Sequence, residues 1–211
     1  VEVQEGRSIR SLGLRLPDHL LIDYGILKAA PALRNRAGAG AILSIYSALW
    51  DWEAAGRREG EFYDQSVARA ARSLLARLFH GASELSRVSD SGLHLLSELH
   101  LGLVRLCEMT ASSRPGKGSE QALTTYLSAR PGRPIVRGQL EGLSVLLAGL
   151  AQGRDVSPAA DYLKRLKLDC SPANLGIPTD ELKQALLQMG RFVRQDTRFN
   201  RGIFHFREDL S

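Results

Sequence analysis

Apolar side chains recur at the spacing of one helix face in most segments of this chain, and this pattern restricts its fold more than any other feature. The clearest stripe consists of Leu96, Leu99, Leu103, Leu106 and Met109. Short runs rich in Gly, Pro and Ser separate such stretches. No segment of useful length alternates with the two-residue period of a strand. The sequence therefore predicts an all-α multi-helix bundle of about seven to nine helices.

The positions of the predicted helices follow from the apolar stripes and their breakers. We expect helices over 32–36, 42–56, 62–79, 90–109, 120–129, 138–150 and 159–166, and one that starts at Thr179. Residues 1–13 are predicted to be irregular or a short strand, and residues 130–134 a turn. Leu20-Leu21-Ile22 fits a strand or the first turn of a helix. The tail, 197–211, is expected on the surface or over another subunit.

The length and composition of the chain fit one domain. It has 211 residues, of which 44% are hydrophobic and only 6% aromatic. We expect a single helical domain over 1–211, made of a lead-in (1–37), a helical core (38–194) and a tail (195–211). The first residue is Val1 rather than Met, so we expect the chain to be a processed or trimmed piece of something longer.

Charge and cysteine content exclude several classes of protein. The net charge is +5, but the basic residues are spread along the chain and matched by acidic ones, without an aromatic-interleaved basic run. We therefore expect no nucleic-acid partner. No apolar run reaches about 18 residues, so no membrane span is expected. The two cysteines, Cys107 and Cys170, lack zinc-ligand spacing and suit a reducing compartment, so we predict a cytoplasmic protein.

A breaker-rich stretch, the central loop (110–121, Thr-Ala-Ser-Ser-Arg-Pro-Gly-Lys-Gly-Ser-Glu-Gln), lies between two apolar helical segments. Arg114 and Lys117 supply positive charge, Ser113 supplies a hydroxyl, and the glycines permit a tight turn. Such a loop, leading into a helix, can hold an anion at the helix N-terminus. Composition alone favours the alternative, a solvated turn between helices.

Other polar side chains predict no catalytic site by themselves. The histidines are His19, His80, His94, His100 and His205, and no pair has metal-ligand or catalytic spacing. The acids Asp51, Glu53, Glu61 and Asp64 lie close together in sequence. We interpret them as the polar end of a helical hairpin rather than as a general acid and base.

Four stretches together resemble a known family. They are Gly40 with Tyr46-Ser-Ala-Leu-Trp-Asp-Trp52, Gly60-Glu61 with Tyr63-Asp64, Ser113-Arg114-Pro115 with Gly118-Ser119-Glu120, and Arg137-Gly138-Gln139. In order and spacing they are similar to motifs of the sn-glycerol-1-phosphate dehydrogenases, in the iron-containing alcohol dehydrogenase and dehydroquinate synthase-like superfamily. The resemblance covers most of the chain and implies the helical C-terminal domain of that family.

The resemblance also implies where a metal site would lie. The family holds zinc or iron with one Asp and two His, and the metal polarises the substrate hydroxyl for hydride transfer to NAD or NADP. The matching positions here are Ala41, Gln121 and Arg137. Ala offers no donor atom, Gln is a weak oxygen ligand, and Arg stays protonated. We expect no metal at these positions.

Two further expectations rest on the resemblance. Nothing in the sequence resembles the family's N-terminal dinucleotide-binding domain, so we expect that domain to be absent and predict no bound NAD(P). The family's loop and helix starts face one cleft, so the candidate anion-binding residues are Ser113, Arg114, Lys117 and Arg137. The alternative for Arg137 is an ion pair with Glu120 or Glu141.

Three hypotheses for function remain open. The first is a degenerate, metal-free pseudoenzyme domain that serves as a binding, regulatory or assembly module, alone as a homo-oligomer or with a partner chain. The second is one part of an NAD(P)-dependent polyol-phosphate dehydrogenase whose cofactor domain lies on another chain or was removed. The third is a protein that binds a phosphorylated small molecule. Whether the chain has enzymatic activity is left undecided by its sequence.

Overall fold

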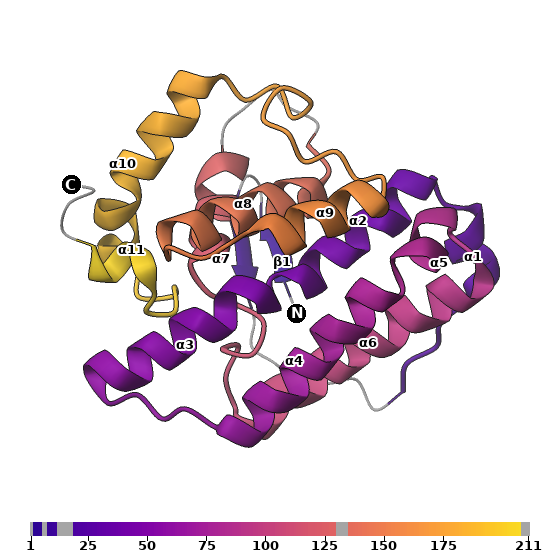
Figure 1. Cartoon of the computed structure of the whole chain (residues 1–211), viewed down its shortest axis with the longest axis horizontal. Coiled ribbons are helices and arrows are strands. Elements are labelled where there is room, and N and C mark those ends of the chain that lie inside the picture. The colour runs from indigo at the N-terminus through magenta and orange to yellow at the C-terminus, as the bar shows by residue number, and fades with distance from the viewer. Residues whose placement is uncertain (1, 6–7, 12–18, 130–134, 208–211) are drawn as a thin grey trace.

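The computed structural model describes residues 2–5, 8–11, 19–129 and 135–207. The helices in these ranges are α1 (Tyr24–Ala29), α2 (Ala32–Leu43), α3 (Ile45–Glu59), α4 (Gln65–His80), α5 (Ala82–Arg87), α6 (Asp90–Met109), α7 (Ser119–Ser128), α8 (Arg137–Ala151), α9 (Ser157–Arg165), α10 (Thr179–Gln195) and α11 (Ile203–Phe206). Two short strands, β1 (Glu2–Glu5) and β2 (Ser8–Ser11), pair antiparallel. Figure 1 shows α8 near the centre of the molecule, and α2, α3, α7 and α9 contact it.

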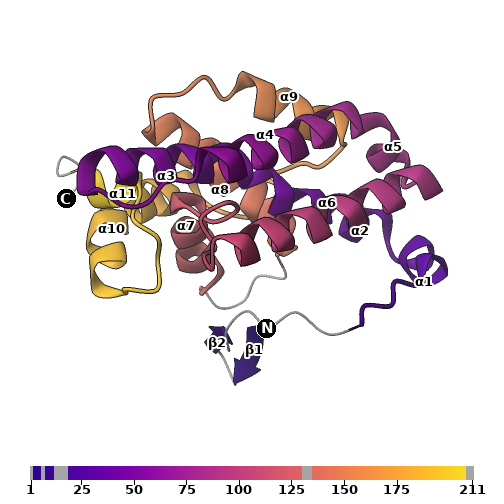
Figure 2. The same ribbon diagram turned by 90° about the horizontal axis from the view of Figure 1, so that it is seen from below.

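The predicted all-α bundle is confirmed for the body of the molecule. The paired strands form a separate two-stranded sheet and lie away from the helices, below α7 and α6 in Figure 2. The described residues hold more helices than expected, because α1, α5 and α11 are too short to show an apolar stripe. The predicted turn at 130–134 lies outside the described residues.

We expected a break between helices at 32–36 and 42–56, but this prediction is wrong: Gly38 and Gly40 do not separate two helices. Both lie inside α2, and the chain breaks only at Ser44, between α2 and α3. A Cβ on Gly40 would overlap the backbone of Gly138, and one on Gly138 would overlap the backbone of Ala37. Glycine is therefore needed here because the axes of α2 and α8 approach closely, and this contact outweighs the usual cost of glycine in a helix.

The core follows the predicted stripes. Buried leucines of α6, α7 and α8 meet α2 and α3, and Trp52 of α3 is the largest fully buried side chain. The indole N–H of Trp52 donates to the carbonyl of Phe62 at 2.8 Å, which ties the middle of α3 to the loop before α4. α8 lies against α2, α3 and α7, which carry parts of the family-like motifs.

The C-terminal segment, residues 196–207, folds back onto its own chain. Phe199, Ile203 and Phe204 are buried in the core. α11 lies at the same end of the molecule as α3 and α10 in both Figure 1 and Figure 2. This part of the tail is therefore covered by the body of the same molecule. None of the helices in the described ranges has the length and hydrophobicity that a membrane crossing requires.

Candidate functional site

The central loop is an ordered turn, and several of its polar groups have partners elsewhere in the chain. The Arg114 side chain is 3% exposed and forms a two-pronged ion pair with Glu61, with Nε 2.6 Å from Oε1. It also donates to the carbonyl of Arg201. Ser113 Oγ accepts from Nδ2 of Asn200 at 3.1 Å, and the same amide donates to the Lys117 carbonyl at 2.7 Å. The loop is therefore not the solvated turn that composition favoured.

The start of α7 also has acceptors of its own. The backbone N–H of Gly118 donates to Glu120 Oε1 at 2.7 Å, and that of Ser119 donates to Asp51 Oδ2 at 2.6 Å. A helix N-terminus attracts anions, and here two carboxyl groups of the protein occupy that position. The candidate anion site made of Ser113, Arg114, Lys117 and Arg137 stays a prediction, and any external anion would have to compete with these groups.

Arg137 is the first residue of α8. Its Nε lies 2.9 Å from Glu141 Oε1, one helical turn further on. The arginine side chain is 45% exposed and that of Glu141 is 18% exposed. This is the ion pair that the sequence offered as the alternative to anion binding.

Ala41 and Gln121, the other two ligand positions, lie on α2 and α7. Ala41 follows Gly40 and Arg137 precedes Gly138, and these two glycines meet at the close crossing of α2 and α8. Gln121 lies in the first turn of α7, which packs along α8. Three helices that contact one another through α8 thus carry Ala41, Gln121 and Arg137. We refer to these residues as the three ligand positions.

The residues at the three ligand positions do not fit a metal. Ala41 has only a methyl group, Gln121 a neutral amide, and Arg137 a permanent positive charge that is held by Glu141. Within the described part of the chain, no three His, Cys, Asp or Glu side chains come together in a way that could hold a metal ion. We therefore derive no metal-dependent step for this chain.

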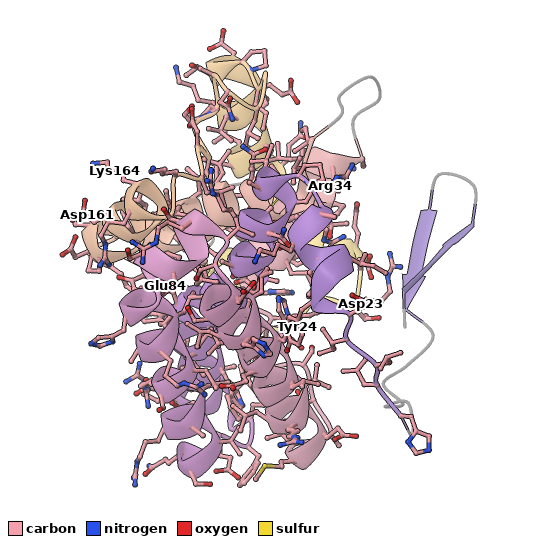
Figure 3. The ribbon with its side chains drawn as sticks, turned by 90° about the vertical axis from the view of Figure 1, so that its right-hand side faces the viewer. Asp23, Tyr24, Arg34, Glu84, Asp161 and Lys164 are labelled. Atoms are coloured by element: carbon pink, nitrogen blue, oxygen red, sulfur yellow. The ribbon has the colours of Figure 1, made fainter. Side chains whose placement is uncertain are left out.

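The histidines of the body have structural contacts. The ring of His94 packs on that of Tyr24, the first residue of α1, with centroids 3.8 Å apart; Tyr24 is labelled in Figure 3. Nε2 of His100 lies 3.0 Å from the carbonyl of Gly38, and burial lowers the pKa of this imidazole. His205 Nδ1 accepts from the backbone N–H of Gly202 at 3.2 Å.

A second polar arrangement, the buried carboxyl cluster, was missed by sequence reasoning. It consists of Asp51, Glu120, Ser47, Ser119 and Gln152, all buried. Asp51 Oδ1 accepts from the N–H of Ile203 at 2.8 Å while its Oδ2 accepts from Ser119. Glu120 Oε2 lies 2.7 Å from Ser47 Oγ. One cluster thus joins α3, α7, the end of α8 and the C-terminal segment.

The acids of the α3–α4 region therefore divide into two groups. Asp64 caps α4 by accepting from the N–H of Ser66 and Val67, and Glu53 pairs with Arg57, as expected for a polar hairpin end. Asp51 is different, because it is fully buried. Its position in the apolar stretch between Leu49 and Trp52 is the sequence signal that could have distinguished Asp51 from the other acids.

Burial sets the protonation of this cluster. It raises the pKa of Asp51, and hydrogen bonds from Ser119 and Ile203 act in the opposite direction. It raises the pKa of Glu120 to about 8 despite the N–H of Gly118, and the negative charge of Asp51 adds to the rise. Glu120 is therefore mainly protonated at neutral pH.

A cavity of about 330 Å³ lies between the central loop, the end of α10 and the C-terminal segment. Its walls include Glu61, Arg114, Arg194, Asn200 and Arg201. Arg114 is paired with Glu61, and Arg201 is paired with Glu59 at 2.9 Å. The C-terminal end of a helix carries a partial negative charge. Arg194, in the last turn of α10, balances that charge. These charges are matched within the protein and do not define a ligand.

Comparison with known proteins confirms the resemblance seen in the motifs. The chain is 28% identical over 180 residues to the glycerol-1-phosphate dehydrogenase [NAD(P)+] of Methanothrix thermoacetophila, covering 85% of this chain and 51% of that protein. It is 28% identical over 182 residues to the enzyme of that name from Hyperthermus butylicus, covering 85% of this chain and 51% of the relative. For Methanosphaerula palustris the match is 25% identity over 194 residues, 92% of this chain and 54% of the relative.

These relatives are longer proteins. The chain spans about half the length of the curated relatives that it matches. That share is consistent with the helical C-terminal domain that the motifs imply. No known family profile matches the chain.

Proposed function

We propose that this chain, similar over most of its length to glycerol-1-phosphate dehydrogenases, is a metal-free helical module that binds, regulates or assembles with a partner. Metal-dependent hydride transfer is not the reaction that its residues support. The observation that carries this proposal is Arg137, which stands at a ligand position and is held there by Glu141. A divalent metal at that position would meet a guanidinium in place of an imidazole.

The physical argument concerns donors and charge together. A zinc or iron site needs several anionic or neutral donors that converge with one position left open. Ala41 and Gln121 leave at most one weak oxygen donor. A unit positive charge beside a dication adds repulsion that is large when the site is partly removed from water. Arg137 is therefore the decisive change among the three ligand positions.

The residues that the motifs share with the family also support a module that keeps its fold. Asp51, Arg114 and Glu120 are buried and bind other parts of the chain. Gly40 and Gly138 permit the close contact of α2 and α8. Each of these residues has a structural reason to be present that is independent of a metal.

A reversal experiment tests the proposal. The triple variant Ala41→Asp, Gln121→His, Arg137→His should bind about one zinc per chain in calorimetric titration, because it restores the three donors at positions joined through α8. The matched control is the double variant Ala41→Asp, Gln121→His, which retains Arg137 and should bind no zinc. Circular dichroism should show that both variants are as helical as the parent.

Two results would contradict the proposal. One zinc or iron per chain in the unmodified purified protein would show that a working site exists. A folded triple variant without zinc affinity would show that the family's ligands do not correspond to these three residues.

The half-length match favours a second candidate. This chain would then be one part of an NAD(P)-dependent polyol-phosphate dehydrogenase whose cofactor domain is supplied by another stretch of protein. Titration of the chain with NADH should give no binding under either hypothesis. Only the second predicts NADH binding, together with polyol-phosphate oxidation, once the partner domain is added. Binding of a phosphorylated ligand by this chain stays a prediction without a specific observation in its favour.

A further inference from the structure

The C-terminal segment is attached to the body by three buried side chains, by hydrogen bonds with the central loop and by a contact with a buried carboxylate; the buried side chains are those of Phe199, Ile203 and Phe204. In the carboxylate contact, the N–H of Ile203 donates to Asp51 Oδ1 at 2.8 Å. Further contacts are the exposed ion pair of Arg201 with Glu59 and the partly buried hydrogen bond of Arg207 Nη1 to the Ala151 carbonyl at 3.2 Å. Asp51 is thus the point at which the segment enters the polar interior of the protein.

The same carboxylate has Glu120 as its neighbour. An atom at the Cβ position of Gly118 would stand 2.6 Å from Asp51 Oδ2 and 3.0 Å from Glu120 Oε2. The two carboxyl groups therefore border one small space beside Gly118. Both are fully buried, so water cannot screen a second negative charge there.

The surroundings of Glu120 suit its protonated form. Ser47 Oγ lies 2.7 Å from Glu120 Oε2 and 3.3 Å from the carbonyl of Ser44. A proton on Oε2 can be donated to Ser47 Oγ, whose own hydrogen then points to Ser44. Oε1 meanwhile accepts from the N–H of Gly118. Every polar atom of a neutral Glu120 thus has a partner.

The other ionisable groups of the surrounding elements do not compensate for a second charge. Arg114 of the central loop is paired with Glu61, and Arg201 of the C-terminal segment with Glu59. Burial, aided by Arg201, lowers the pKa of His205 to about 4, so this imidazole is neutral throughout the range in which Glu120 titrates. The remaining neighbours within the cluster, Ser119 and Gln152, are uncharged.

We propose that the C-terminal segment is a pH-sensitive strap, held closed while the Asp51–Glu120 pair carries one proton and loosened when that proton leaves. Loss of the proton to solvent places two negative charges in one buried space. The segment is the part that yields, because it is joined to Asp51 by the first N–H of the four-residue helix α11. α3 and α7, which carry the two acids, are longer and also pack against α8. The inference does not depend on the proposed function.

Gly202 provides an independent way to open the strap. A Cβ there would stand 2.5 Å from Ser119 Oγ and 2.6 Å from Asp51 Cγ. The backbone of Gly202 is extended, so alanine is compatible with its dihedral angles. Gly202→Ala should therefore separate the segment from Asp51 without altering the helices of the body.

Hydrogen exchange measured by mass spectrometry at pH 6.5 and pH 9.5 tests the proposal on the full chain. After correction for the intrinsic pH dependence of exchange, amides 199–206 should exchange about tenfold faster at pH 9.5, as expected for a proton lost near pH 8. Glu120→Gln, which mimics the protonated acid, should exchange slowly at both values. The matched control Glu98→Gln alters an exposed acid on α6 and should behave like the parent.

The loosening variants complete the test. Asp51→Asn removes one of two acceptor oxygens and should exchange rapidly in 199–206 at both pH values. If Asp51→Asn does not fold, Gly202→Ala gives the same test, with Gly25→Ala of α1 as its control. Equal corrected exchange of the parent at the two pH values, or a pH effect that persists in Glu120→Gln, would overturn the proposal. Unchanged exchange in Gly202→Ala would overturn the close contact on which it rests.

Discussion

Two polar regions of this molecule are built from family-like motifs, and they differ in the residues that they contain and in what those residues bind. At the three ligand positions, a methyl group, an amide and a guanidinium stand where the resemblance places an Asp and two His. In the buried carboxyl cluster, both acids are present, and each accepts a backbone N–H. α7 contributes to both regions, through Gln121 and Glu120.

The difference lies in what each residue does when no ligand is bound. Ala41 and Gln121 are partly exposed and Arg137 is exposed. A different side chain at any of these positions would therefore leave no buried polar group without a partner. Asp51 and Glu120 bind groups that have no access to water, so the fold itself requires them. The residues of the motifs that the fold requires are thus present, whereas those that the resemblance assigns to a metal are not.

The largest effect that would test this comparison is expected for Asp51→Ala. It removes the acceptor of two buried N–H groups, and each unpaired donor costs about 1–3 kcal/mol. We expect the free energy of unfolding in urea at pH 6.5 to fall by about 3–5 kcal/mol. The control Asp155→Ala removes an exposed carboxylate that accepts from Ser157, and should cost about 1 kcal/mol or less. Similar losses in the two variants would contradict a structural requirement specific to the cluster.

A smaller effect is expected from pH. The pKa of Glu120 is about 8 in the folded protein, against 4.5 for an ordinary glutamate, so the folded state holds a proton that the unfolded chain releases. The free energy of unfolding should therefore fall as the pH rises from about 4.5 to 8, by an amount on the order of several kcal/mol. Burial of Asp51 acts with the same sign.

Urea unfolding at a series of pH values measures this slope. Glu120→Gln should be as stable as the parent near pH 5 and more stable at pH 9, because the variant has no proton to lose. A slope that is identical in parent and variant would show that Glu120 is ionised in the folded protein at neutral pH.

The sequence predicted the helical body because its stripes report which face of each helix is buried. The helix predicted over 90–109 is correct in both bounds, and the side chain of Ser89 caps it by accepting from the N–H of Gly92. The helix predicted over 62–79 ends one residue later, at His80, and Thr179 begins α10 as predicted. These features depend on local chemistry that a single segment carries.

Features that depend on distant contacts could not be predicted in the same way. Gly38 and Gly40 indicated a break, but the approach of Gly138, about a hundred residues away in the chain, gives glycine a place inside α2. Asp51 looked like a surface acid until Ser119 and Ile203 were brought to it. The identity of the three ligand positions was available only from the family resemblance, because nothing in their spacing indicates a site.

The smallest expected effect distinguishes two arginines of the family-like motifs. Arg137→Ala removes the exposed ion pair with Glu141, four residues further along α8. Such pairs contribute about 0.3–0.5 kcal/mol to the stability of a helix. We expect its free energy of unfolding to lie within about 0.5 kcal/mol of the parent. Arg114→Ala is the matched comparison, because it removes a buried guanidinium that holds both Glu61 and the Arg201 carbonyl. It should cost about 2–4 kcal/mol, since those groups would lose their partner in a poorly hydrated place. Urea unfolding of both variants at pH 6.5 measures the difference. A loss of more than about 1.5 kcal/mol for Arg137→Ala would mean that the guanidinium at the ligand position is required by the fold, and the contrast between the two regions would no longer hold.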